Sequence, residues 1–150
     1  MRFRTRSNCH ARPTAHPQRR GSAAIELAIV LPILVTVLLG ATDFGRFSYS
    51  AIAVANAARS GAAYGIMNPF DSSTQTAWQT AVKQAAIDEL SQSPAFDTSK
   101  LTVTVTSTTE SSGLRRVSVQ ASYPFTTIVH WSYLPFSFNL NQTVVMRGIR

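Results

Sequence analysis

An apolar run near the N-terminus constrains this chain more than any other feature. The twenty residues from Ser22 to Ala41 carry a single ionisable side chain, Glu26, and are otherwise uncharged and mostly apolar. At about 1.5 Å of rise per residue, a helix of this length spans roughly 30 Å, the hydrocarbon thickness of a bilayer. We therefore expect a transmembrane helix over residues 22–42, in a membrane protein or a precursor routed through a membrane.

Positive charge is concentrated ahead of this run. The formal net charge is +7, and residues 1–20 hold six arginines and no acid. Basic residues beside an apolar helix stay on the cytoplasmic side of a membrane, which places the C-terminal part outside. We predict that residues 1–21 form a disordered basic leader. A basic arm that binds nucleic acid is the alternative, but the rest of the chain is nearly neutral, so we expect no nucleic-acid partner.

The helical pattern continues beyond the apolar run, over residues 43–66. Apolar residues recur there at spacings of three and four: Phe44, Phe47, Ala51, Val54, Ala58 and Ala62. We predict one continuous helix from about 22 to 64, with Ser22 as its N-cap and a kink at Pro32. Its outer stripe includes Gly61 and Gly65, which would let another backbone approach, and we expect the chain's own C-terminal domain to cover it.

Residues 67–150 predict a small extracytoplasmic domain. Asn68-Pro69 ends the first helix, and a second helix follows over about 74–91. The apolar side of this second helix is expected to hold Trp78, Ala81, Val82, Ala85 and Leu90.

A period of two then predicts strands. Apolar residues alternate with Thr and Ser over 101–106 and again over 117–123, as in a hairpin with one apolar face. An aromatic-rich connection bracketed by Pro124 and Pro135 leads to a third strand over about 137–147. The predicted fold class is α+β: a long N-terminal helix, a second short helix and an antiparallel sheet of about three strands packed on the helices.

Catalytic signatures are lacking in this sequence. A single histidine and no cysteine follow the apolar run, the acids show no paired spacing, and there is no glycine-rich phosphate loop. Cys9 precedes the run and can form no intramolecular disulfide. We expect no enzyme activity, no cofactor, no metal and no small-molecule substrate.

The junction between leader and run combines Gly21, Ser22 and the carboxylate of Glu26. A carboxylate inside a bilayer costs on the order of a few kcal/mol, so a partner is expected. Cleavage after Gly21 would create an amine at Ser22, with a pKa of about 8, that can pair with Glu26. The alternative is that Glu26 only reaches the headgroups.

Asp43 and Arg46 lie where the predicted helix leaves the membrane. They are three residues apart and can pair on one helix face, which contributes only tenths of a kcal/mol, about 0.2–0.5. The expected role of this membrane-exit pair is to set the depth of the helix in the bilayer.

Three separated motifs resemble one family. They are Gly21-Ser-Ala-Ala-Ile-Glu26 with Pro32, then Asp43-Phe44-Gly45-Arg46, then Asn56-Ala-Ala-Arg-Ser-Gly-Ala62. Over about residues 20–64 the chain resembles the TadE-like family, pseudopilin-type proteins of tight-adherence (Flp) pilus systems. One departure from the family pattern is Leu27, where an aromatic residue is frequent.

The resemblance implies a single-pass protein of the bacterial inner membrane that is needed for pilus assembly. Its partners would be a prepilin peptidase, other pilin-like subunits and pilus assembly proteins. Gly21 would be the last leader residue, Ser22 the mature N-terminus, and Glu26 the carboxylate used in processing or subunit docking.

The alternative reading is an extracytoplasmic binding module, secreted or membrane-tethered, with an ordinary signal anchor and no pilus role. Ala51-Ile52-Ala53 has small residues at the relative positions that signal peptidase needs. This site lies about ten residues beyond the apolar run, inside the predicted helix. The alternative predicts a soluble domain that starts near Val54.

Overall fold

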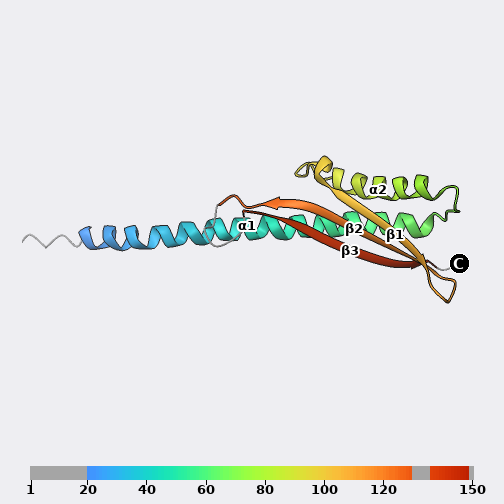
Figure 1. Ribbon diagram of the computed structural model, residues 1–150. Coiled ribbons are helices and arrows are strands. Elements are labelled where there is room, and N and C mark those ends of the chain that lie inside the picture. Colours follow the sequence, from blue (N-terminus) through green and yellow to red (C-terminus); the bar gives the residue numbers. More distant parts are fainter. Residues whose placement is uncertain (1–19, 130–135, 149–150) are drawn as a thin grey trace, which may run out of the picture. The chain divides into compact units, whose positions relative to one another are not determined.

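The computed structural model describes residues 20–129 and 136–148. In chain order its elements are α1 (Arg20–Met67), α2 (Gln75–Ser91), the short 3₁₀ helix η1 (Thr98–Lys100), β1 (Thr102–Thr109), β2 (Arg115–Thr126) and β3 (Ser137–Gly148) (Figure 1). The predicted α+β class is confirmed. The predictions for leader residues 1–19 and for connection residues 130–135 lie outside the described residues.

The chain divides into two compact units between Val37 and Leu38. Of the described residues, the first unit contains the N-terminal part of α1. The second contains the rest of α1, together with α2 and all three strands. The membrane boundaries at residues 22 and 42 stay predictions.

Helix α1 begins earlier than predicted, so the assignment of Ser22 as N-cap is wrong. The helix starts at Arg20, which places Ser22 inside the first turn. There its hydroxyl donates to the Glu26 carboxylate one turn on instead of capping a backbone amide. At the other end, the backbone and side-chain amides of Asn68 both donate to the Tyr64 carbonyl, at 3.0 and 2.9 Å. Pro69 cannot extend the helix further.

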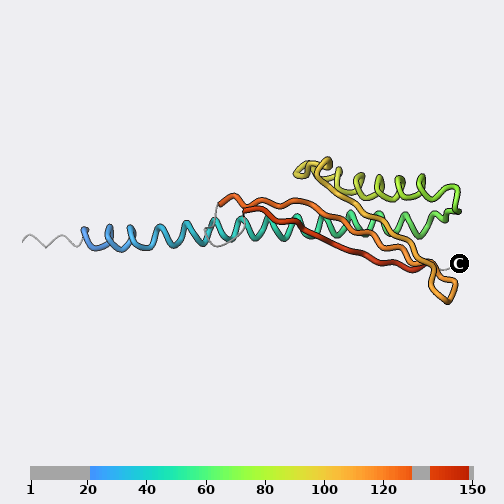
Figure 2. The backbone as a smooth tube through the Cα atoms, viewed as in Figure 1, coloured from blue at the N-terminus to red at the C-terminus, as the bar shows by residue number. Residues whose placement is uncertain are grey.

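The strands form one antiparallel sheet in the order β1-β2-β3 (Figure 2). The register pairs Val119 with Val105 on one side and with Val144 on the other. The alternation over 117–123 puts apolar side chains on one face as predicted, but β2 does not end there and continues through Pro124 to Thr126. β1 pairs only as far as Ser122, so Pro124 lies where β2 has a single neighbour and its missing N–H is tolerated.

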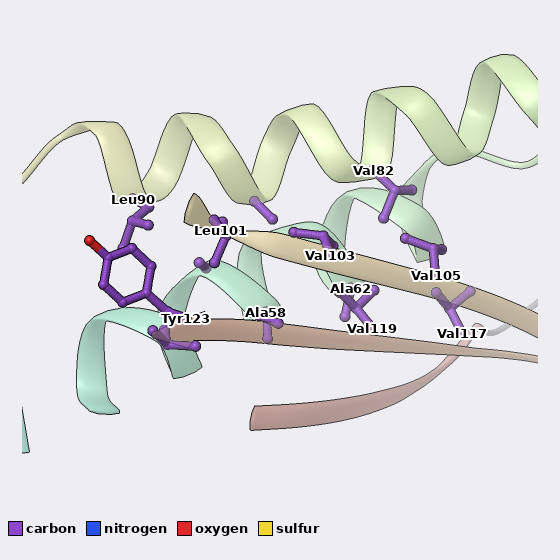
Figure 3. Close-up of a cluster of buried hydrophobic side chains, with 14 of the residues drawn as sticks. Ala58, Ala62, Val82, Leu90, Leu101, Val103, Val105, Val117, Val119 and Tyr123 are labelled. Carbon is purple, nitrogen blue, oxygen red and sulfur yellow. The ribbon is translucent and has the colours of Figure 1, made fainter. Parts of the chain in front are cut away.

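One face of the sheet encloses the core together with α1 and α2 (Figure 3). Helix α1 contributes four apolar side chains that are fully buried: Val54, Ala57, Ala58 and Ala62. The prediction that the chain covers its own outer stripe is confirmed. A Cβ built on Gly61 would lie 3.1 Å from the Val82 carbonyl oxygen, so hydrogen at this position is what lets α2 approach.

Two details of the predicted core are wrong. Phe44 was placed on the buried stripe but is 70% exposed, because the covered face of α1 runs through Phe47 and its neighbours one turn later. On α2 the buried residues are Trp78, Val82, Ala86 and Leu90, at a spacing of four. Ala86 therefore replaces Ala85, which is only half-buried at the edge of the contact.

Asp71 organises the turn that precedes α2. Its Oδ1 accepts from the Ser73 hydroxyl at 2.6 Å and from the backbone amides of Ser73 and Thr74 at 2.9 and 3.0 Å. The hydrogen bond from the Ser73 hydroxyl, followed by that from the Thr74 amide, lowers the pKa of Asp71 below its ordinary value. The charged carboxylate thus holds together the turn that leads into α2, whose N-cap residue Thr74 makes no side-chain capping hydrogen bond.

Candidate functional site

The predicted processing junction lies in the first turns of α1. Gly21 is exposed, and a Cβ built there would meet nothing within 4 Å. Ser22 and Glu26 are brought together, with 3.3 Å between the serine Oγ and the carboxylate Oε1. The spacing of four residues puts both on one helix face. An amine created at Ser22 would therefore start within one turn of the carboxylate.

The apolar run that follows is exposed at every residue except Gly40, which is half-buried. Its large side chains from Ile25 to Leu39 are 38% to 66% exposed. Among the described residues, one helix, Gly21–Met67, is long and apolar enough to cross a membrane. Helices with an apolar surface all round belong in an apolar surrounding.

Pro32 lies inside this segment, and α1 continues through it without interruption. Since proline has no N–H, the carbonyl four residues earlier lacks its usual helical donor. Four residues later, Thr36 donates its hydroxyl to the Pro32 carbonyl at 2.8 Å. The kink at Pro32 stays a prediction.

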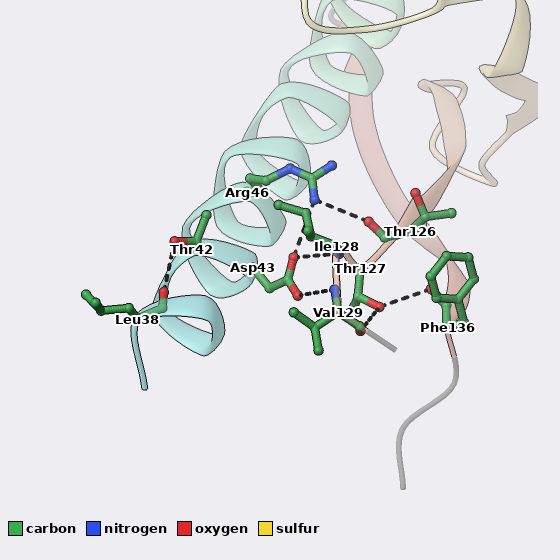
Figure 4. A network of polar contacts seen from close by, with 9 residues as sticks. All are labelled: Leu38, Thr42, Asp43, Arg46, Thr126, Thr127, Ile128, Val129 and Phe136. Atoms are coloured by element: carbon green, nitrogen blue, oxygen red, sulfur yellow. Dashed lines mark hydrogen bonds and ion pairs between the residues drawn. The ribbon is translucent and has the colours of Figure 1, made fainter. Parts of the chain in front are cut away.

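Asp43 does more than the predicted pairing with Arg46. Arg46 Nη1 lies 3.4 Å from Asp43 Oδ1. The Asp43 carboxylate is also buried, and it accepts the backbone amides of Ile128 at 2.9 Å and Val129 at 3.4 Å (Figure 4). Arg46 reaches the same region, because its Nη1 donates to the Thr126 carbonyl at 3.5 Å. We call this set of contacts the Asp43 latch.

The latch fastens the end of β2 to α1. The amides it binds belong to residues 128 and 129, just after β2 ends at Thr126. Buried carboxylates that accept backbone N–H groups form strong, charge-assisted hydrogen bonds. Sequence reasoning missed this role because the partners are 85 and 86 residues away. One signal was present: Asp43 shares the helical spacing of the buried Ser50 and Val54.

An apolar cluster surrounds the latch. The Phe47 ring lies 5.9 Å from that of Phe125, edge to face, and 5.9 Å from that of Phe138. The Arg46 guanidinium carbon lies 5.6 Å from the centre of the Phe125 ring. Phe44 stands on the solvent side of Phe47, with ring centres 6.4 Å apart. Cationic and aromatic groups therefore meet where the domain begins.

The described residues offer no metal centre, since no group of three or more His, Cys, Asp or Glu side chains is close enough to hold an ion. What remains is a structural arrangement: a small α+β domain closed on the outer part of an apolar helix, with a glycine and a lone carboxylate at the start of that helix. The arrangement joins a folded α+β domain to a helix that is long and apolar enough to cross a membrane.

Comparison with known protein families gives a match to part of helix α1. Residues 21–63 match the family model described as TadE-like protein, so the resemblance to the TadE-like family is confirmed over this segment. The match begins at Gly21, where processing is predicted, and ends on the buried stripe of α1. The match implies that the chain is a component of tight-adherence pilus assembly. Proteins of the TadE-like family are pilus components and are not known enzymes. No curated protein and no solved structure matches the chain.

Proposed function

We propose that this chain is a membrane-anchored minor pilin-like protein required for assembly of a tight-adherence pilus. It would lie in the bacterial inner membrane with residues 1–21 in the cytoplasm, residues 22–42 in the bilayer, and residues 43–150 in the periplasm. The observation that carries the proposal is the TadE-like match over residues 21–63, which falls on α1 from Gly21 to its buried stripe.

The exposed apolar helix supports the anchor. Removing a Leu, Ile or Val side chain from water contributes about 1.5–3 kcal/mol, and the run exposes many of them from Ile25 onward. In a bilayer, these apolar side chains would be removed from water by the surrounding lipid. The arginine-rich leader then sets the orientation, because cationic residues flanking the helix stay in the cytoplasm.

Processing and docking are assigned to the junction. The exposed backbone at Gly21 suits a prepilin peptidase, whose cut would free the amine of Ser22. Glu26 lies one helical turn from that amine and is the run's single charge. Pairing the two, within a subunit or between neighbouring subunits, lowers the free energy of the carboxylate in lipid. Lateral docking would then join this helix to other pilin-like helices.

Mass spectrometry of the membrane-bound protein tests the processing step. We expect a mature chain that begins at Ser22. The variant Gly21→Ala should keep its leader, whereas Gly45→Ala, the same change at another open position of α1, should be processed normally. Isolation of a native chain that retains its leader while pili are being built would contradict the proposal.

Piliation tests the docking step. Glu26→Gln keeps the shape of the side chain and removes its charge. We expect this variant to insert in the membrane but to support no pilus assembly. Glu89→Gln makes the same change on α2 of the outer domain and should leave piliation intact. Normal piliation with Glu26→Gln would leave the helix as an anchor only.

The alternative of a released binding module is disfavoured by the position of its cleavage site. Ala51-Ile52-Ala53 lies within α1, and Val54, the first residue after the cut, is fully buried in the core. Release there would also detach Asp43 from the β2 end that it holds.

A further inference from the structure

We propose that the apolar cluster at the start of the outer domain is a lipid-binding seat that rests in the headgroup layer of the bilayer. We name it the apolar base and define it as Phe44, Phe47, Phe125, Ile128 and Phe138. The inference depends on the membrane anchor of the proposed function and adds a second contact with lipid, made by the folded domain itself.

Three of the five residues of the apolar base are exposed although they belong to the folded domain, while Phe47 is half-buried and Phe125 is buried beneath them. Phe44 is 70% exposed, Ile128 57% and Phe138 37%. A hollow of about 360 Å³ opens beside Phe44 and Phe138, and it is lined by the four phenylalanines of the base together with Gly40, Asp43 and Thr127. Contiguous exposed apolar surface of this kind marks a site for a protein or a membrane.

Chain continuity selects lipid as the occupant. The last residues of the apolar run, Leu38 to Ala41, belong to the same compact unit as the base. Phe44 follows Ala41 by three residues of continuous helix, about 4.5 Å along the axis. The polar headgroup layer on each side of the hydrocarbon is about 5–7 Å thick. An anchor that ends at Ala41 therefore holds Phe44 within that layer.

The charge beside the base fits a phospholipid surface. Among the described residues Arg46 places a cation beside the base, and its side chain is 46% exposed. Its partner carboxylate, Asp43, is buried and turned toward the amides of Ile128 and Val129. The exposed charge beside the apolar base is therefore positive. Segments that lie in a membrane interface combine cationic and apolar residues in this way to bind headgroups and the upper parts of acyl chains.

The far end of the same sheet supplies an internal contrast. β3 runs along α1: Phe138 packs on Phe47 near its start, and Gly148 faces Ile66 at its end. Val145 is 50% exposed on this strand. It lies eight residues beyond Ser137, about 26 Å along the strand, and so well outside a headgroup layer that the base occupies.

Lipid quenching of single labels tests the seat. The full chain with Cys9→Ser, its only cysteine, is placed at low density in phosphatidylethanolamine–phosphatidylglycerol vesicles. One cysteine is then introduced per variant and labelled with a fluorophore: Ile128→Cys in the base, Val145→Cys as its matched control, and Leu34→Cys in the anchor. Ile128 and Val145 are both exposed β-branched residues, 57% and 50%.

We expect headgroup-level nitroxide lipids to quench the label at residue 128 about fivefold more strongly than the label at 145, given the separation along the strand. A deep nitroxide should quench the label at 34. Equal quenching at 128 and 145, with 34 quenched, overturns the seat and leaves the anchor. Absence of quenching at 34 overturns anchor and seat together. Shielding at 128 that needs high protein density and no lipid assigns the base to a second copy and also overturns the seat.

Discussion

Adding one methyl group at Gly65 should destabilise the outer domain. A Cβ there would lie 3.1 Å from Trp78 Cζ2, 3.1 Å from Val117 Cγ1 and 3.2 Å from Val82 Cγ2. These contacts come from α2 and β2, so no single side chain can turn away to relieve them. The Gly65 carbonyl also accepts the Trp78 indole N–H at 3.2 Å, which holds the ring in place.

The magnitude follows from two opposing effects. Alanine is favoured over glycine in a helix by about 1 kcal/mol, whereas overpacking a core costs about 1–3 kcal/mol. With three contacts tighter than ordinary van der Waals distance, the overpacking cost exceeds the helix-propensity gain, and we expect Gly65→Ala to lower the free energy of unfolding by up to about 2 kcal/mol. This corresponds to a fall in Tm of up to about 10 °C for a domain of this size.

Gly45→Ala is the matched control on the same helix. A Cβ at Gly45 would meet nothing within 4 Å, so this variant should be more stable by about 0.5–1 kcal/mol through helix propensity alone. Thermal unfolding of both variants in detergent micelles, followed by near-ultraviolet circular dichroism, measures the difference. A Gly65→Ala protein as stable as Gly45→Ala would refute the packing argument.

Two further predictions concern carboxylates. Asp43→Ala should speed hydrogen exchange of the Ile128 and Val129 amides by about tenfold to a hundredfold, from the loss of charge-assisted hydrogen bonds, and unchanged exchange measured by NMR would refute the latch. Hydrogen bonds hold the pKa of Asp71 below its ordinary value, so the stability that the Asp71 carboxylate contributes is present above that ordinary value and is lost as pH falls through the lowered pKa. The variant Asp71→Asn should remove this loss of stability at acid pH. An unaltered pH profile of unfolding would show that the Asp71 turn contributes nothing.

Most secondary structure of the outer domain could be predicted because its signals are local. The two-residue alternation around Val103 and Val119 defines a strand face wherever the strand packs, and Asn68-Pro69 ends a helix by its own chemistry. The misses occur where neighbours decide. Pro124 is tolerated within β2 because β1 begins only opposite Ser122 and does not reach it, and no feature of the sequence around Pro124 reports where another strand begins.

The candidate site shows the same division. Ser22 and Glu26 are four residues apart, so a helix brings them together whatever else the chain does. Asp43 is different, because its amide partners, Ile128 and Val129, are brought to it only when the end of β2 lies against α1. Spacing on one helix predicted the contact with Arg46 and could not predict the latch.

The sequence by itself determined the apolar run, its basic leader, and the order of two helices followed by strands. These features could be predicted because hydrophobic periodicity and charge are local signals, carried by residues that lie close together in the sequence. Only the tertiary structure decided which side of α1 is covered. Gly61 faces α2 while Phe44 remains exposed, because the covered face depends on how two helices and a sheet pack around one core, and apolar residues occur on more than one face of α1.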